Sequence, residues 1–261
     1  MKPLGVDVAM RGRVRQVLHD VEHTYGVKVL YACESGSRGW GFASPDSDYD
    51  VRFLYVHQPD WYLRVEPQRD VIELPIDDEL DVCGWEWRKA LRLLKSANPA
   101  LIEWLDSPIV YQQDDATLAA LRVQVPHWFS PVRARWHYYS MAKKNFRGYL
   151  QGEQVRLKKY FYVLRPLLAV RWIEAGKGMP PMRFATLLAG SDLDAPLRAE
   201  IDELLVLKQR AGEAQYGAQR PLLHAFIGDE LARGEIADAL PESRSGKVSD
   251  LDALLYQTVM S

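Results

Sequence analysis

The sequence predicts an α/β (α+β) fold in which a small mixed-sheet domain is followed by an all-helical domain. Up to about residue 115, short apolar runs of strand length alternate with stretches of helical periodicity, and beyond that point strand signals largely disappear. The charge changes sign at the same place, because residues 1–115 hold 13 basic and 20 acidic residues whereas residues 116–261 hold 20 and 15. We therefore expect one domain over residues 1–115 and a second over residues 116–261, both of ordinary domain size.

The first domain is predicted to open with a helix, a strand, a glycine-rich turn and a second strand. Residues 11–25 place apolar side chains at helical spacing, and Gly26 follows as a stop signal. Residues 27–35 form an apolar run of strand length. A cluster of glycines comes next, and residues 48–56 then have the pattern of another strand.

The remainder of the first domain is predicted to alternate between short strands and helices. The expected elements are strands over residues 71–74 and 79–84, a helix over 85–97 and an extended segment over 107–111. Asn98 and Pro99 suit the N-cap and the first turn of a short helix that ends near Asp106.

The second domain is predicted to consist of helices bounded by Pro, Gly or Ser. Helical periodicity covers residues 131–150, 154–176, 196–212, 221–234 and 249–260. Pro166 lies inside the second of these helices. A proline has no N–H to donate, so we expect the carbonyl of Tyr162 to lack its usual helical donor there.

Several classes of protein are excluded by composition. The longest apolar runs are interrupted by charged residues, and none approaches the roughly 18 to 20 residues that cross a bilayer. The N-terminal residues lack an apolar core followed by a small-residue cleavage site, so we expect a cytoplasmic protein with no membrane partner. Cys33 and Cys83 are too few for a disulfide framework or a four-ligand zinc site, and we expect reduced, buried thiols.

Positive charge is concentrated in residues 131–183. This window holds twelve Lys or Arg residues against two glutamates, Glu153 and Glu174, and it is interleaved with aromatic residues. Such a composition suits a polyanion that also presents flat bases. It equally suits a basic amphipathic helical pair whose aromatic side chains form a core, so both interpretations stay open.

Residues 34–56 carry the strongest indication of chemistry. Gly36 and Ser37 end a predicted strand at a turn, where main-chain N–H groups and a hydroxyl are able to cradle a phosphate. Asp48 and Asp50 come at the start of the next strand, and the alternation of side chains along a strand points both to one face. Two carboxylates on one face repel each other without a cation and form a site for divalent ions. A plain turn over these residues is the alternative.

Phosphoryl chemistry with two metal ions usually needs a third carboxylate from another part of the chain. Asp81 is the best candidate, because it lies on a predicted strand between apolar residues. Asp77, Asp78 and Glu86 compete with it for this role. Arg38 is expected either beside the phosphates or in a pair with a nearby acid.

Together these residues resemble the signature of the DNA polymerase beta-like nucleotidyltransferase superfamily. More narrowly, residues 36–56, 81–111 and 158–173 resemble the predicted nucleotidyltransferase family that includes the YcgL and the RNA-repair-ligase-associated RlaP proteins. The likeness extends from about residue 30 to residue 190. It implies a mixed sheet flanked by helices, two Mg²⁺ ions held by three carboxylates, and transfer of a nucleotide from an NTP.

The resemblance also assigns roles to residues. Asp48 and Asp50 match the metal pair and Asp81 the third acid, whereas Gly36 and Ser37 match the phosphate turn. In the second domain, a basic helix face is expected to approach the triphosphate across the interdomain cleft, or else to be a solvated surface. Its members are Lys158, Lys159 and Arg165.

The function that we predict is that of a Mg²⁺-dependent nucleotidyltransferase. It would move a nucleotide from an NTP to an acceptor hydroxyl, with an RNA or tRNA end as the favoured acceptor. Two alternatives remain: transfer to a protein hydroxyl, as in toxin-like members of the superfamily, and a non-catalytic module that binds nucleotides or nucleic acid. The basic aromatic window favours RNA over protein, and the retained carboxylates argue against a non-catalytic module.

Overall fold

The computed structural model describes residues 6–77, 79–210, 215–236, 240–242 and 244–261, and the chain divides into two compact units. The first, called the sheet unit, comprises Met1–Gly39, Asp48–Phe129 and Arg244–Ser261. The second, called the helical unit, comprises Trp40–Ser47 and Ser130–Ser243. The short segment Trp40–Ser47 therefore leaves the sheet unit and packs within the helical one.

A five-stranded mixed sheet forms the centre of the sheet unit, with the strand order β3-β4-β2-β1-β5. The strands are β1 (Val27–Glu34), β2 (Tyr49–His57), β3 (Val71–Glu73), β4 (Leu80–Glu86) and β5 (Val110–Gln113). Strands β2 and β4 pair in parallel, and the other neighbours are antiparallel. The predicted mixed α/β class of this part of the chain is confirmed.

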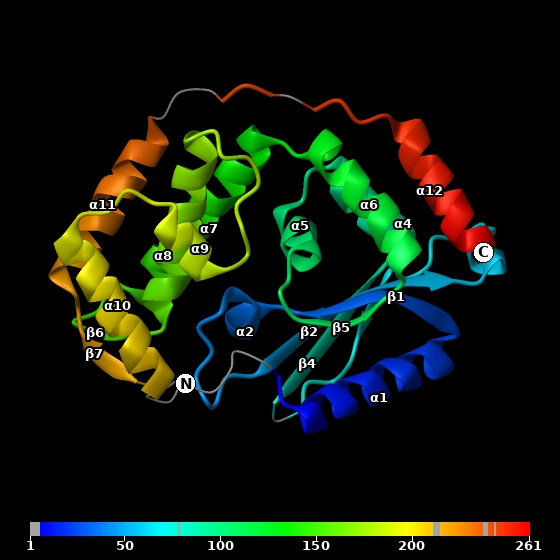
Figure 1. Cartoon of the computed structure of the whole chain (residues 1–261), viewed down its shortest axis with the longest axis horizontal. Coiled ribbons are helices and arrows are strands. Elements are labelled where there is room, and N and C mark those ends of the chain that lie inside the picture. Colours follow the sequence, from blue (N-terminus) through cyan, green and yellow to red (C-terminus); the bar gives the residue numbers. More distant parts are fainter. Residues whose placement is uncertain (1–5, 78, 211–214, 237–239, 243) are drawn as a thin grey trace. The chain divides into compact units, whose positions relative to one another are not determined.

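Helices cover both faces of this sheet (Figure 1). One face carries α1 (Val8–Tyr25), and the other carries α4 (Trp87–Lys95), α5 (Pro99–Leu105), α6 (Asp115–Trp128) and α12 (Val248–Met260). The connections also contain the short helices α2 (Gly36–Trp40) and α3 (Pro59–Tyr62). As predicted, the side chain of Asn98 caps α5, where it accepts a hydrogen bond from the N–H of Leu101.

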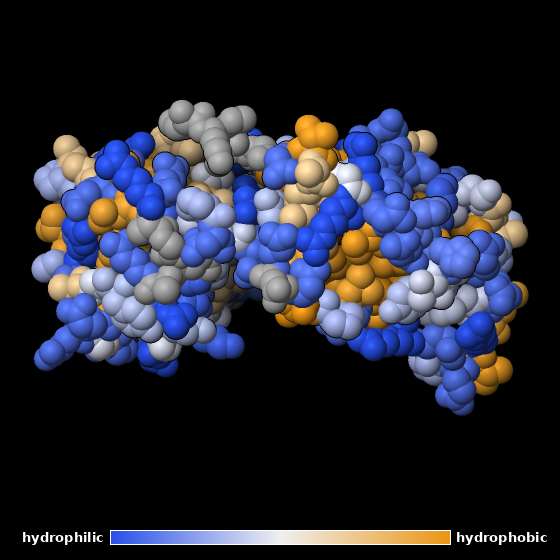
Figure 2. Space-filling model, turned by 90° about the horizontal axis from the view of Figure 1, so that it is seen from below, coloured by the Kyte–Doolittle hydropathy of each residue, from blue (hydrophilic) through white to orange (hydrophobic). Residues whose placement is uncertain are grey.

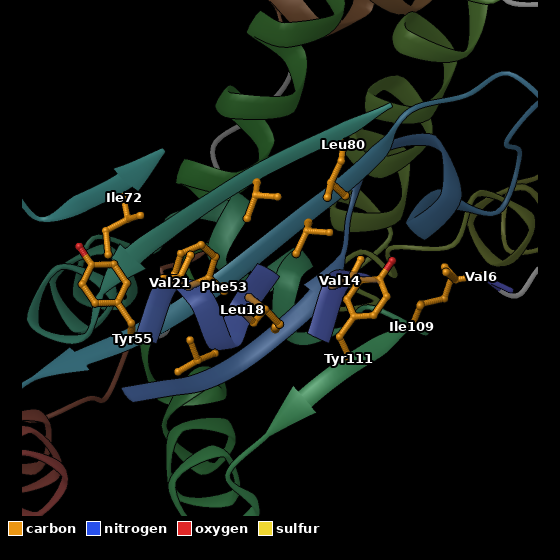
Figure 3. Packing of buried hydrophobic residues seen from close by; sticks show 14 of the residues in the cluster. Val6, Val14, Leu18, Val21, Phe53, Tyr55, Ile72, Leu80, Ile109 and Tyr111 are labelled. Atoms are coloured by element: carbon orange, nitrogen blue, oxygen red, sulfur yellow. The ribbon is translucent and has the colours of Figure 1, made fainter. Parts of the chain in front are cut away.

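The core beneath α1 forms where the apolar face of the helix packs against the apolar face of the sheet. Val14, Leu18 and Val21 recur at helical spacing on α1, whereas alternate residues of β2, among them Phe53 and Tyr55, point from the strand toward the helix. Figure 3 shows these side chains directed into one cluster. The opposite side chains of β2 are therefore available for the other face of the sheet.

Within its described residues, the helical unit contains five helices and a two-stranded sheet. The helices are α7 (Pro131–Tyr149), α8 (Lys159–Glu174), α9 (Phe184–Ala189), α10 (Ala195–Arg210) and α11 (Pro221–Glu235). Antiparallel strands β6 (Gln154–Arg156) and β7 (Tyr216–Ala218) form the small sheet. The sequence analysis did not predict these strands, and it extended the helix that contains Pro166 back to residue 154. Three-residue strands are too short to show an alternating pattern.

The segment Trp40–Ser47 is held in the core of the helical unit by aromatic contacts. Phe42 is almost completely buried, with ring centroids 5.0 Å from Phe161 and 5.6 Å from Phe184. Trp40 lies beneath the guanidinium of Arg165, whose carbon is 4.7 Å from the ring centroid. The predicted glycine-rich turn is thus the short helix α2 followed by a segment that belongs to the other unit.

The two units divide the chain at different residues from the predicted boundary between 115 and 116. That boundary falls inside the sheet unit, because α6 packs against β1 and α12 returns to pack against α4 and α6. Buried Leu118, Leu121 and Val125 form the apolar face of α6. An amphipathic pattern shows that a helix has a buried face, but it does not show which core that face joins.

Pro166 is accommodated within α8 by a side chain from α7. The carbonyl of Tyr162, four residues before the proline, accepts a hydrogen bond from Nδ2 of Asn145 at 3.1 Å. This contact fits the prediction that proline deprives that carbonyl of its usual helical donor.

Across the described part of the chain, no helix combines the length and the apolar character that a membrane span requires. The side of the molecule drawn in Figure 2 is mostly hydrophilic, and hydrophobic residues reach that surface in separate patches.

We predict that Asn145→Ala lowers the free energy of unfolding by about 1 kcal/mol, because the carbonyl of Tyr162 loses its side-chain donor. In a Pro166→Ala background the backbone N–H of residue 166 is restored, so the same substitution is expected to cost much less. Urea unfolding of the four variants measures this coupling. An equal cost in both backgrounds would show that Asn145 does not compensate for the proline.

Candidate active site

The candidate site forms where β1 ends and β2 begins. These antiparallel strands pair so that Glu34 lies opposite Val51, and the main-chain N–H of Ser35 donates to the carbonyl of Asp50 at 2.8 Å. The chain then turns into α2 at Gly36. The structure therefore brings together Gly36, from the predicted phosphate turn, and Asp50, from the predicted metal pair.

Gly36 is required by the close approach of Asp50. Its φ of 54° lies in the left-handed region, and a Cβ at this position would lie 1.9 Å from Oδ2 of Asp50. No side chain fits in that space without displacing the carboxylate. Ser37 follows as a buried residue of α2. That Gly36 and Ser37 hold phosphate stays a prediction.

Asp50 and Asp81 lie beside each other because β2 and β4 pair in parallel with these residues in register. One guanidinium nitrogen of Arg52, Nη2, is 3.0 Å from Oδ1 of Asp50 and 2.7 Å from Oδ2 of Asp81. Although burial opposes the charge on Arg52, the hydrogen bond to Asp81 and the charge of Asp50 raise its pKa above the ordinary value. The carboxylates of Asp50 and Asp81 thus both contact the guanidinium of Arg52.

Asp48 is exposed and lies one residue before β2. Its carbonyl oxygen accepts a hydrogen bond from Nε of Arg38 at 3.3 Å. The guanidinium of Arg38 also lies over the ring of Tyr49, at 3.8 Å from the centroid. Arg38 therefore contacts the main chain between the two predicted metal ligands, and its predicted contact with phosphates remains to be tested.

The acids that compete with Asp81 have other partners. Asp77 binds Arg13 at 2.6 Å, and the main-chain N–H groups of Glu79 and Leu80 lower its pKa. The buried Glu86 caps α4 and also accepts a hydrogen bond from the hydroxyl of Tyr62. Asp78 lies outside the described residues.

The donor chemistry of the site fits a divalent cation. Carboxylate oxygens are the ligands that Mg²⁺ prefers, and the carboxylates of Asp50 and Asp81 lie side by side, each with one oxygen held on Nη2 of Arg52. Asp48, the other member of the predicted metal pair, lies one residue before β2, so strand alternation does not place it on the face of Asp50, and its role as a ligand stays a prediction. Within the described residues, however, no three His, Cys, Asp or Glu side chains are close enough together to form a metal site.

Comparison with known proteins decides the family. Residues 10–257 match the family RlaP, described as "RNA repair pathway DNA polymerase beta family". The chain belongs to the RlaP family. It is also 47% identical over 251 residues to "Uncharacterized protein YcgL" of Bacillus subtilis (strain 168), a match that covers 96% of each chain. The predicted resemblance is confirmed, and the family is of the nucleotidyltransferase type.

Among solved structures, the chain is similar to a nucleotidyltransferase-like protein from Exiguobacterium sibiricum 255-15. The two are 14% identical, and the match covers 95% of this chain and 76% of the other, with a TM-score of 0.32.

Sequence analysis missed one buried acid beside the candidate site. Glu34 ends β1, is fully buried, and accepts hydrogen bonds from the main-chain N–H of Asp50 and the hydroxyl of Tyr111. Burial raises its pKa to about 7, against the hydrogen bond from Tyr111, which lowers it. A glutamate that follows the apolar run of residues 29–33 was the available signal, because acids are seldom fully buried without partners.

The basic residues predicted to approach the triphosphate all belong to the helical unit. Lys158 directly precedes α8. The ammonium of Lys159 lies over the ring of Tyr149, 4.0 Å from the centroid. Arg165 is buried, and both its Nε and Nη2 donate to the carbonyl of Met182 at 3.3 Å. Arg165 thus has a structural role in this unit, and contact of these three residues with an NTP stays a prediction.

The basic aromatic window is part core and part surface. Its buried aromatic residues are Tyr138, Tyr139, Tyr160 and Phe161. Arg135 is buried as well and pairs with Glu174 at 2.7 Å. Trp136 and Tyr149, by contrast, are about half exposed, at 47% and 50%. The alternative of core aromatic residues therefore holds for four of the nine Phe, Trp and Tyr residues of the window, whereas Trp136 and Tyr149 lie at the surface.

We predict that Gly36→Ala disrupts the site, because its methyl group would collide with the Asp50 carboxylate. Gly26→Ala is a matched control, since Gly26 has a similar φ of 61° but no atom within 4 Å of the added Cβ. Both variants should lose about 1 kcal/mol of stability to backbone strain. Only Gly36→Ala should also weaken Mn²⁺ binding, measured by titration. Equal Mn²⁺ affinities in the two variants would contradict the close approach.

Proposed function

We propose that this chain is a Mg²⁺-dependent nucleotidyltransferase that transfers a nucleotide from an NTP to an RNA end. The observation that carries the proposal is that the carboxylates of Asp50 and Asp81 lie next to each other, held by Arg52, beside the turn at Gly36. Carboxylates and a glycine turn at one place are what the phosphates of an NTP and their metal ions require. Membership in a DNA polymerase beta family supports the same chemistry.

In this proposal each residue has a defined task. Asp48, Asp50 and Asp81 hold the divalent ions, while the N–H groups and hydroxyl at Gly36 and Ser37 bind the phosphates. Bound Mg²⁺ supplies Lewis acidity, which makes the acceptor hydroxyl easier to ionise and offsets charge on the phosphates. The acceptor oxygen bonds to the α-phosphorus, the bond to the β-phosphate bridging oxygen breaks, and pyrophosphate leaves. Asp81 is the ligand nearer the acceptor hydroxyl or, in the alternative role, the acceptor of its proton.

In this proposal the acceptor is RNA, and two observations support that choice. The family is described as belonging to an RNA repair pathway, and the helical unit exposes Trp136 and Tyr149 within its basic window. Aromatic side chains among basic groups suit single-stranded nucleic acid, because bases stack on the rings while phosphates meet the charges. A protein hydroxyl is the alternative acceptor.

We predict that Asp50→Asn reduces nucleotide transfer at least about 100-fold, because it removes a charged metal ligand and keeps the shape of the side chain. The assay incubates pure protein with each labelled NTP, Mg²⁺, total RNA and total protein, and it follows where the label goes. Asp77→Asn is a control, because Asp77 pairs with Arg13, whereas Asp50 pairs with Arg52. Near-normal transfer by Asp50→Asn would exclude the assigned metal site, and label on protein alone would exclude the RNA acceptor.

A second prediction concerns the binding of RNA. Because phosphate contacts release counterions, the affinity should fall with salt, with a log–log slope of about −0.7 for each phosphate contacted on a single strand. Replacing the exposed Lys144 and Arg147 by Ala should flatten this slope by about 0.7 for each phosphate that the variant no longer neutralises. Arg198→Ala, an exposed change outside the window, is the control. Salt-independent binding, or none at low salt, would favour a protein acceptor.

A further inference from the structure

Arg52 makes two kinds of contact at the candidate metal site. Its Nη1 donates to the main-chain carbonyls of Val51 and Asp81, at 3.1 Å and 3.0 Å. Its Nη2 donates to the carboxylates of Asp50 and Asp81. Main-chain carbonyls of paired strands are fixed by the sheet, so the Nη1 contacts hold the planar guanidinium in one place. Only 18% of the side chain is exposed.

This anchored guanidinium determines how the two carboxylates are turned. Its Nη2 donates hydrogen bonds to Oδ1 of Asp50 and Oδ2 of Asp81. With Oδ1 of Asp50 held on Arg52, Oδ2 of the same group faces Gly36 at the start of the predicted phosphate turn. A carboxylate without such a contact rotates readily about its last bond.

The same contact removes a repulsion that the strand pairing creates. Asp50 and Asp81 are direct neighbours on β2 and β4, and like charges in that arrangement are destabilising. Arg52 places a permanent positive charge between them, since an arginine stays ionised at any ordinary pH. The carboxylates therefore remain close together before any metal ion binds.

We propose that Arg52 is a positioning residue of the metal site, which orients the carboxylates of Asp50 and Asp81 and stays in place when a divalent ion binds. The inference rests on the proposed function, and it assigns a role to a residue that is neither a ligand nor a phosphate contact. Groups that hydrogen-bond to metal ligands typically change metal affinity by about 10- to 100-fold when they are removed.

A competing arrangement predicts the opposite sign. If Nη2 occupied the position of the metal ion, the ion would have to displace it, and removal of Arg52 would then strengthen metal binding. The direction of the change in affinity therefore separates a positioning residue from a competitor.

The experiment measures the binding of Mn²⁺ to the full chain, by the electron paramagnetic resonance of the free ion. We expect Arg52→Gln to bind Mn²⁺ about 10- to 100-fold more weakly than the parent. Arg52→Lys should be weakened similarly, because a single ammonium cannot hold two carbonyls and two carboxylates at once. Arg13→Gln is the matched control. Arg13 also bridges two acids, Asp77 and Glu79, at 2.6 Å each, and its loss should leave the affinity unchanged.

The outcomes are distinguishable. Tighter or unchanged Mn²⁺ binding by Arg52→Gln would overturn the positioning role while the proposed function stands. Parental affinity in Arg52→Lys would show that charge alone suffices, and it would equally overturn the role of the anchored guanidinium. Absence of Mn²⁺ binding by the parent chain would overturn the proposed function and this inference with it. Circular dichroism verifies that each variant is folded, and Arg52→Lys keeps the test decisive if Arg52→Gln unfolds.

Discussion

The parallel pairing of β2 with β4 is the constraint on which the rest of the candidate site depends. In this register Asp50 lies opposite Asp81 and Val51 opposite Val82, and both valines are buried in the core beneath α1. A shift by one residue would turn Asp81 into that core and Val82 out of it. Burial of the apolar face of the sheet thus fixes the register of β2 and β4. That register sets the positions of the two carboxylates on the opposite face of the strands.

A glycine reinforces this register from within the core. Gly84 lies opposite Phe53, and a Cβ at residue 84 would lie 2.2 Å from the phenylalanine ring. The ring therefore fits against β4 only where the strand has no side chain. Gly36 has the same effect at the candidate site, because the Asp50 carboxylate occupies the space that a side chain at residue 36 would fill. Two glycines at close approaches thus define where the strands and the turn meet.

Local patterns predicted the elements well, and they predicted long-range contacts poorly. The strands that carry Asp50 and Asp81, the cap at Asn98 and the effect of Pro166 all follow from residues near one another in sequence. Arg52 was not assigned a role, because its partner Asp81 is 29 residues away and a charged residue on a strand gives no sign of what it bridges. The membership of α6 in the sheet unit was missed for a similar reason. The apolar face of a helix does not show which hydrophobic core it packs against.

The segment Trp40–Ser47 separates the two sequence motifs of the candidate site along the chain. Gly39 is the last residue of one part of the sheet unit and Asp48 the first of the next, so the chain between the predicted phosphate turn and the metal pair belongs wholly to the helical unit. Phe42 fixes that segment among aromatic rings, and burying such a ring stabilises the segment by about 1.5 to 3 kcal/mol. Asp48 is the first residue after this segment and lies one residue before β2, whereas Asp50 and Asp81 lie within paired strands of the sheet.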